Sequence, residues 1–242
     1  MEKDSSVFSI MKKNENSNVT VIIPTLNEEE NIAEVIRELN QIGYWDILII
    51  DGNSVDKTVQ VAKEFGVNVL SQNGRGKGAA LRQAFSHDGL NGDLVIMMDA
   101  DGSMDPREIP SLLEALDSGA DLAKASRFLH WGYSEDMNLI RRIGNTFFVF
   151  LVNLLWSAGF TDLCYGFGAF RKDAVKKLFP HLKSANFEIE TEIFIKAKKL
   201  GLKVVEVPSI ELRRRHGKSN LSTFWDGLRI LKTIIEELVN GP

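Results

Sequence analysis

The chain has 242 residues, of which 44% are hydrophobic and 26% are charged, and its formal net charge is -4. This length suffices for one sizeable hydrophobic core, and the negative charge argues against a protein that coats nucleic acid, so we expect no nucleic-acid partner. The single cysteine, Cys164, excludes an internal disulfide framework and a cysteine-rich zinc site.

The first half of the chain alternates short apolar runs with helical patterns. We expect strands at 19–23, 47–50, 67–70 and 94–98, and helices at 27–43, at 57–65 and from the glycine-rich loop 73–78 through Phe85. Asn27, with Glu30 three residues later, predicts a capping box for the first helix, and Asp56 predicts the cap of the second. This alternation indicates a parallel sheet that is covered on both faces.

The pattern is less regular in the second half. We expect a helix at 106–119, a strand at 121–126, an amphipathic helix within 134–160, a strand at 165–170, a helix at 188–200 and a strand at 203–207. Apolar residues then recur at helical spacing from Phe224 to Leu238. We therefore divide the chain into a flexible polar leader (1–17), one main domain (18–220) and a C-terminal amphipathic helix (221–242), which packs on the body, on a partner or on lipid.

Residues 143–161 carry no charge over a length close to that of a membrane span. Polar side chains interrupt the segment, among them Asn145, Thr146 and Asn153. A helix that packs on the core or lies at a membrane surface therefore fits this segment better than a spanning helix.

Three carboxylates follow predicted strands. Asp99 and Asp101 come directly after the strand 94–98, and Asp51 ends the strand 47–50. The carboxyl ends of parallel strands are where open α/β sheets bind ligands, and oxygen-rich side chains suit Mg²⁺ or Mn²⁺, which can hold nucleotide phosphates. The alternative is that these aspartates cap the helices that follow.

Basic residues lie in two loops. The loop 74–78 contains Arg75 and Lys77 between glycines, but it matches neither the Walker pattern nor the dinucleotide fingerprint, which disfavours ATP hydrolysis and NAD binding. The run 213–218 follows the last strand and could close over phosphates, or it could be a solvated face. Arg127, at the end of its own strand, and Arg141 are further candidates for an anionic ligand.

Four segments of the first half, 22–32, 51–58, 76–78 and 99–102, together resemble the family 2 glycosyltransferases. In the second half, residues 126–128, Asp162 with 166–171, and 206–208 are similar to the branch that makes polyprenyl-phosphate (dolichol-phosphate) sugars. The resemblance spans about residues 19 to 220. It implies the GT-A fold, an α/β architecture with a single Rossmann-like, mostly parallel sheet flanked by helices, and sugar transfer with inversion at the anomeric carbon.

The resemblance also implies roles for individual residues. The expected nucleotide-sugar-binding set is Pro24, Leu26, Glu28, Ile49, Asp51, Lys77, Asp99, Ala100, Arg127, Arg214 and Asn220. The expected ligands of Mg²⁺ or Mn²⁺ are Asp99, Asp101 and Ser103. The expected catalytic set is Asp101, Asp162, Arg127 and Glu190, with Asp162 as the candidate base or acceptor-positioning residue and Glu190 as the second candidate base.

The sequence departs from the branch at several of its motif positions. Leu26 stands where Tyr is common, Gly52 where a second Asp is common, and Ser103 where Gln is common. The usual Gly-x-Ser-Lys after the last strand is replaced by 217–220, in which the lysine, Lys218, is shifted by two positions. These departures affect the stacking of the nucleotide base, the ligation of the metal and the contact that the lysine makes in the branch.

The function implied is metal-dependent transfer of a hexose from a GDP- or UDP-sugar to a polyprenyl phosphate, by a cytoplasmic protein associated peripherally with the inner face of the membrane. A lipid phosphate oxygen is already ionised near neutral pH, so this acceptor needs no strong base. The alternatives are a soluble hydroxyl acceptor, which would need one, a nucleotide-sugar-binding regulator without turnover, and a nucleotidyltransferase.

Overall fold

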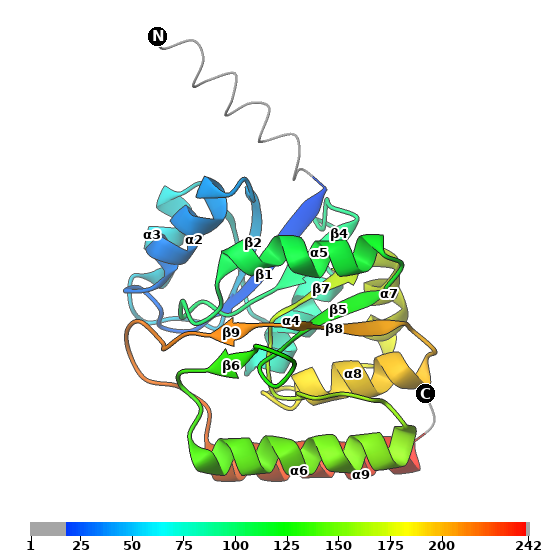
Figure 1. Ribbon diagram of the computed structural model, residues 1–242. Helices are drawn as coiled ribbons and strands as arrows, with labels where there is room; N and C mark the ends of the chain where they lie inside the picture. Colours follow the sequence, from blue (N-terminus) through cyan, green and yellow to red (C-terminus); the bar gives the residue numbers. More distant parts are fainter. Residues whose placement is uncertain (1–17, 241–242) are drawn as a thin grey trace.

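The computed structural model describes residues 18–240, so the leader predicted at 1–17 lies outside the described residues. A seven-stranded sheet with the order β3-β2-β1-β4-β7-β5-β8 forms the centre of the molecule (Figure 1). Its strands are β1 (Val19–Thr25), β2 (Asp46–Asp51), β3 (Asn68–Ser71), β4 (Leu94–Met97), β5 (Leu122–Ser126), β7 (Gly168–Arg171) and β8 (Val204–Pro208). All neighbours pair in parallel except β7, which is antiparallel to both β4 and β5. The predicted mostly parallel α/β sheet is confirmed.

Helices cover both faces of this sheet, as the alternation predicts. The first group is α2 (Ile32–Gln41), α3 (Thr58–Glu64) and α5 (Ile109–Asp117). The second group is α4 (Lys77–Phe85), α6 (Leu139–Trp156), α7 (Lys172–Leu178), α8 (Ile189–Lys199) and α9 (Thr223–Val239). Successive residues of a strand point to opposite faces, so Val21 and Ile23 pack in the core cluster of the first group, while Ile22 packs in that of the second.

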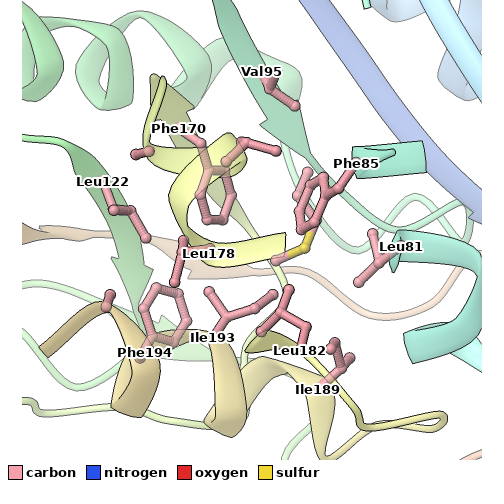
Figure 2. Close-up of a cluster of buried hydrophobic side chains, with 14 of the residues drawn as sticks. Leu81, Phe85, Val95, Leu122, Phe170, Leu178, Leu182, Ile189, Ile193 and Phe194 are labelled. Atoms are coloured by element: carbon pink, nitrogen blue, oxygen red, sulfur yellow. The ribbon is translucent and has the colours of Figure 1, made fainter. Parts of the chain in front are cut away.

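The core on the second face joins helices that lie far apart in the sequence. Leu81 and Phe85 of α4, Phe170 of β7 and Ile193 of α8 meet there (Figure 2). The rings of Phe85 and Phe170 lie 5.8 Å apart at a tilted angle, a favoured aromatic geometry. This packing fixes α8, and with it Glu190, against the sheet.

The start of the first helix differs from the prediction. The helix α2 begins at Ile32, and Asn27 and Glu30 form no capping box. Asn27 instead adopts a left-handed conformation (φ 55°), and its side-chain oxygen accepts the backbone N–H of Val55 at 2.9 Å. This bond ties the loops after β1 and β2 together, which is why the side chain is not used as a cap. Asp56 lies one residue before Lys57, the N-cap residue of α3, but its carboxylate still accepts the N–H of Thr58, the first residue of that helix, at 2.9 Å.

Two boundaries in the second half also differ. The helix expected within 134–160 starts only at Leu139, because Asn138 caps it by accepting the N–H of Arg141 at 2.9 Å. Residues 133–134 form instead the short strand β6 (Tyr133–Ser134), which pairs with β9 (Ile210–Glu211). The strand expected at 165–170 occupies Gly168–Arg171. Because β7 is antiparallel, the segment before it lies at the carboxyl ends of β4 and β5, a placement that the sequence pattern does not reveal.

The helices α6 and α9 lie side by side at one end of the molecule, beyond α8 (Figure 1). The helix α9 is the amphipathic C-terminal helix that the sequence predicts. Its inner face includes Glu237, whose carboxylate lies 3.0 Å from the ammonium groups of both Lys196 and Lys199 on α8. These side chains are at most 10% exposed, so this ion pair is shielded from solvent and fixes α9 to the body.

The substitution Glu237→Gln tests this attachment. It leaves two buried lysines without their carboxylate, which is costly in a region of low dielectric. We expect the free energy of unfolding to fall by about 2 to 3 kcal/mol, measured by urea denaturation. The neighbouring Glu236→Gln is the control, because Glu236 pairs with Lys232 in solvent and should change stability by less than about 0.5 kcal/mol. Equal losses in the two variants would contradict this assignment.

Candidate active site

The parallel register of β1, β2 and β4 brings their carboxyl ends to one edge of the sheet. Thr25 pairs with Asp51, and Ile22 pairs with Met97, two residues before Asp99. Asp51 is buried, and its carboxylate accepts hydrogen bonds from the hydroxyl and the N–H of Ser54, at 2.6 and 2.9 Å. Asp51 therefore shapes the loop after β2, on the rim of the predicted nucleoside pocket.

Lys77, at the first residue of α4, joins two carboxylates from distant elements. Its ammonium lies 2.6 Å from Asp99, which follows β4, and 2.5 Å from Glu190 of α8. Burial alone would lower the pKa of Lys77, but the charges of Asp99 and Glu190 outweigh it and raise that pKa above its ordinary value. Burial also raises the pKa of Glu190, against the opposing effect of Lys77. Lys77 is therefore a fixed positive charge.

The segment that precedes β7 lies against the ion pair between Lys77 and Glu190. Gly166 approaches so nearly that an added Cβ would lie 2.5 Å from both Oε1 of Glu190 and Nζ of Lys77. Only glycine fits this position without displacing the ion pair. The match to the family motif at 166–171 thus has a physical reason at its first residue.

Arg214 joins a second pair of carboxylates. One guanidinium nitrogen lies 3.1 Å from Asp101, and the other forms a short contact with Glu28. Glu28 is buried, which raises its pKa, although Arg214 and Asn31 oppose this shift through hydrogen bonds. Asp101 also accepts the backbone N–H of Ser103 at 3.0 Å. The predicted residues Glu28, Asp101, Ser103 and Arg214 are thus brought together.

This arrangement fits a divalent cation. The inner cluster contains the carboxylates of Glu28, Asp99, Asp101 and Glu190 but only the cations of Lys77 and Arg214, a formal excess of two negative charges. Within residues 18–240 no three acidic, His or Cys side chains form a complete metal cage, and the Asp99 side chain is 30% exposed. Mg²⁺ is commonly held by one or two carboxylates together with substrate phosphates, as such an incomplete set requires.

The structure buries Arg127 and Asp162 together in an ion pair, a placement that differs from the substrate-facing roles expected of them. Asp162 is fully buried and bonded to Nε and an Nη of Arg127 at 2.8 and 3.0 Å, while the other Nη bonds Glu211 at 3.1 Å. Burial would raise the pKa of Asp162, but the charges of Arg127 and Lys124 lower it to about 2. A carboxylate this weakly basic is poorly suited to accept a proton, and the Arg127 side chain is only 6% exposed, which leaves it little access to a phosphate. Both residues instead support the segment before β7.

Other members of the predicted binding set lie at different depths. Pro24 and Leu26 are at the end of β1, where Leu26 is 41% exposed and can contact a base. The side chains of Ile49 and Ala100 are buried in the core cluster that includes Ile32 and Ile36 of α2. Asn220 is exposed and lies in the segment between Gly217 and α9.

Two residues of this region, Glu211 and Arg215, were not named individually from the sequence, although Arg215 lies in the basic run 213–218. Glu211 bonds Arg127 and the hydroxyl of Ser134. Arg215 reaches from the segment after β9 to Glu38 of α2 at 2.7 Å. Two signals in the sequence bear on Arg215: the basic run 213–218 itself, and the spacing of Glu34 and Glu38, which places two carboxylates on one face of α2.

The comparisons with known proteins agree with this geometry. The family model "Glycosyl transferase family 2" matches residues 20–179, more than half of the chain, so the protein belongs to this family and is a glycosyltransferase. An uncharacterized protein of Methanocaldococcus jannaschii is 33% identical over 99% of this chain and 98% of its own length. A dolichol-phosphate mannosyltransferase of Pyrococcus furiosus is 33% identical over 87% of this chain, which spans only 62% of that relative.

Solved structures share the fold. Glucosyl-3-phosphoglycerate synthase from Mycobacterium tuberculosis, crystallised with Mn²⁺, UDP-glucose and phosphoglyceric acid, superposes with a TM-score of 0.74. It is 20% identical, and the match covers 97% of this chain and 84% of that one. The GT-A fold expected from the resemblance is confirmed.

The substitution Asp162→Asn tests the supporting role of Asp162. It leaves Arg127 buried without its carboxylate, and we expect a loss of about 3 kcal/mol in the free energy of unfolding at pH 7. The pKa of Asp162 falls from 3.8 to about 2 on folding, so its stabilisation is present above pH 4 and is lost as the pH falls toward 2. Urea denaturation between pH 5 and 2 should show the difference between wild type and variant shrink by about 2 kcal/mol.

The exposed Asp173→Asn is the control for this experiment, because the Asp173 side chain is 87% exposed. It should alter stability by less than about 0.5 kcal/mol over the same pH range. A difference between wild type and Asp162→Asn that stays constant with pH would contradict a low pKa for Asp162.

Proposed function

We propose that the protein transfers a hexose, with inversion and with Mg²⁺ or Mn²⁺, from a GDP- or UDP-sugar to a polyprenyl phosphate at the cytoplasmic face of the membrane. The observation that carries the proposal is the exposed apolar face of α6 and α9 on a glycosyltransferase whose carboxylates meet at one sheet edge. The names of the relatives support this acceptor, since the Pyrococcus furiosus protein is a dolichol-phosphate mannosyltransferase. The Mn²⁺ and UDP-glucose in the Mycobacterium tuberculosis structure support the metal and the type of donor.

The residues of the site divide the work of transfer between them. Asp99 and Asp101 would hold the metal ion, which offsets the charge that develops on the departing nucleoside diphosphate. Arg214 binds the diphosphate of the donor, and Leu26, with the loop shaped by Asp51, lines the nucleoside pocket. Lys77 holds Asp99 and Glu190 in place and adds a fixed positive charge beside the leaving group.

The acceptor oxygen forms a bond to the anomeric carbon as the bond from that carbon to the diphosphate breaks, with inversion. A polyprenyl phosphate attacks through an oxygen that is already ionised, so no proton has to be removed. Asp162 is therefore not required as a base, in keeping with its ion pair to Arg127.

The apolar face of α6 and α9 provides a surface for lipid. Its exposed side chains are Leu139, Ile140, Ile143, Phe147, Phe150 and Leu154 of α6, and Phe224, Trp225, Leu228, Ile235 and Leu238 of α9. Among the described helices α6 alone is long and apolar enough to cross a membrane by length and composition, and 17% of it is buried. An exposed apolar surface of this extent marks an interaction site, and two amphipathic helices side by side suit the interface of a bilayer.

A soluble acceptor is the second candidate, because the Mycobacterium tuberculosis enzyme was crystallised with phosphoglyceric acid. Glu190 would then be the base for a hydroxyl acceptor. Burial raises the pKa of Glu190 above its ordinary value, and through Lys77 it lies beside Asp99, within the site rather than beneath it.

Transfer of labelled sugar tests the acceptor and the metal together. We expect one of GDP-mannose, UDP-glucose or UDP-N-acetylglucosamine to yield an organic-extractable product with a short polyprenyl phosphate, and only when Mn²⁺ or Mg²⁺ is present. The substitution Asp101→Asn should lower the initial rate by at least about 100-fold, because it removes one of two metal-binding carboxylates. Asp105→Asn, a change of the same kind four residues further on, should retain the wild-type rate.

Each other outcome has a definite meaning. Label that leaves the donor but stays in water would favour the soluble acceptor. Donor binding without transfer to any acceptor would favour the regulator. A fully active Asp101→Asn variant would remove the basis for the metal site.

Flotation with liposomes tests the apolar face. The substitution Trp225→Glu places a charge on α9 within this face, and we expect it to reduce the bound fraction on vesicles containing anionic lipid several-fold. Trp45→Glu is a matched control, because Trp45 is 43% exposed but lies at the start of β2, away from α6 and α9. Equal flotation of wild type and Trp225→Glu would contradict membrane contact through this face.

A further inference from the structure

Three arginines in a row, Arg213, Arg214 and Arg215, follow β9, and the structure gives each a different environment. Arg214 points to Glu28 and Asp101. Arg215 reaches Glu38 at 2.7 Å and Glu34 at 3.4 Å, both on α2. Arg213 is exposed. The three neighbours can therefore be compared with one another. Arg214 faces the site, Arg215 anchors the segment to α2, and Arg213 does neither.

The segment around Arg215, residues 212–216, is bonded on both sides. On one side the N–H groups of Leu212 and Arg215 bond the carbonyls of Ser103 and Asp101, at 2.8 and 3.2 Å. On the other side the N–H of His216 bonds the side-chain oxygen of Asn31 at 3.1 Å. In Figure 1 the segment after β9 runs toward the α2 side of the molecule before it turns to α9. It thus spans from the Asp99–Ser103 loop to α2.

Arg215 is the side chain that connects these two sides. Its aliphatic part lies on Gly102, where an added Cβ would come within 2.6 Å of Cδ and Nε of the arginine. Its guanidinium bonds both carboxylate oxygens of Glu38, at 2.7 and 2.8 Å, and is 23% exposed. Gly102 directly follows Asp101, so Arg215 contacts the backbone of the metal-binding loop and α2 at once.

We propose that Arg215 is a positioning residue, which holds the segment 212–216 closed so that Arg214 lies over Asp101 and meets the diphosphate of the donor. Arg215 itself does not touch the donor. Its effect passes through Arg214, the next residue in the chain, and through the loop of Asp101. This inference rests on the proposed function for the identity of the ligand. The bonds that hold the segment 212–216 in place do not depend on that function.

Nucleoside-diphosphate binding provides a test that needs no acceptor. Wild-type protein is titrated with GDP and with UDP in the presence of Mn²⁺ by calorimetry, and the tighter nucleotide is used for all variants. We expect Arg215→Ala to weaken binding about tenfold, Arg215→Lys to weaken it less, and Arg213→Ala to remain within about twofold of wild type. In an Arg214→Ala background, Arg215→Ala should weaken binding no further, because the residue through which it acts is absent.

Two results would overturn the proposal. One is wild-type affinity in Arg215→Ala, and the other is an equal loss of affinity from Arg215→Ala whether Arg214 is present or not. Thermal unfolding of each variant verifies that the protein remains folded.

Amide hydrogen exchange separates failure of this inference from failure of the proposed function. Peptides that cover 212–217 should exchange faster in Arg215→Ala than in Arg213→Ala, since the bonds to Asp101 and Asn31 open more often. Equal exchange in the two variants would overturn the positioning role. If wild type bound neither nucleotide while Arg215→Ala still exchanged faster, the proposed function would fail and the positioning of the segment by Arg215 would stand.

Discussion

The structure depends on pairing buried carboxylates with cations that come from distant parts of the chain. A parallel sheet gathers acidic side chains at one edge, where burial disfavours their charged forms. Lys77, Arg127 and Arg214 each bond two carboxylates, and each pair includes partners from different elements. The loops after β1, β4 and β9 and the start of α8 are thereby fixed relative to one another, and the site is organised by the same contacts that stabilise the fold.

These pairs do not all serve the same purpose. The group around Arg127 is the most deeply buried, and with Asp162 and Glu211 it supports the segment that leads into β7. The groups around Lys77 and Arg214 lie closer to solvent, since the side chain of Asp99 is 30% exposed and that of Asp101 is 18% exposed. This gradient from the core to the surface separates the groups that hold the architecture from those that can meet a ligand.

The sequence predicts the part of this arrangement that local pattern controls. Asp51 and Asp99 were located correctly because each follows a run of apolar residues that forms a buried strand. The partners of Arg127 and Arg215 were not located, because Asp162 and Glu38 stand 35 and 177 positions away and no periodicity connects them. The capping box at Asn27 was wrong for the same reason, since its side chain bonds a loop 28 residues further on. Ion pairs and loop contacts of this range depend on the tertiary fold, which a local pattern does not encode.

The antiparallel strand β7 has a consequence for how the chain is made. Within residues 18–240 it is the only strand that links β4 to β5, so a sheet formed by the first hundred residues or so keeps β4 as an unpaired edge until residues 168–171 have been synthesised. An exposed edge strand is a template for pairing with other chains. Until this pairing forms, the open side of the half-sheet carries Val95, Ile96 and Met97, and pairings between residues so far apart in the chain slow folding.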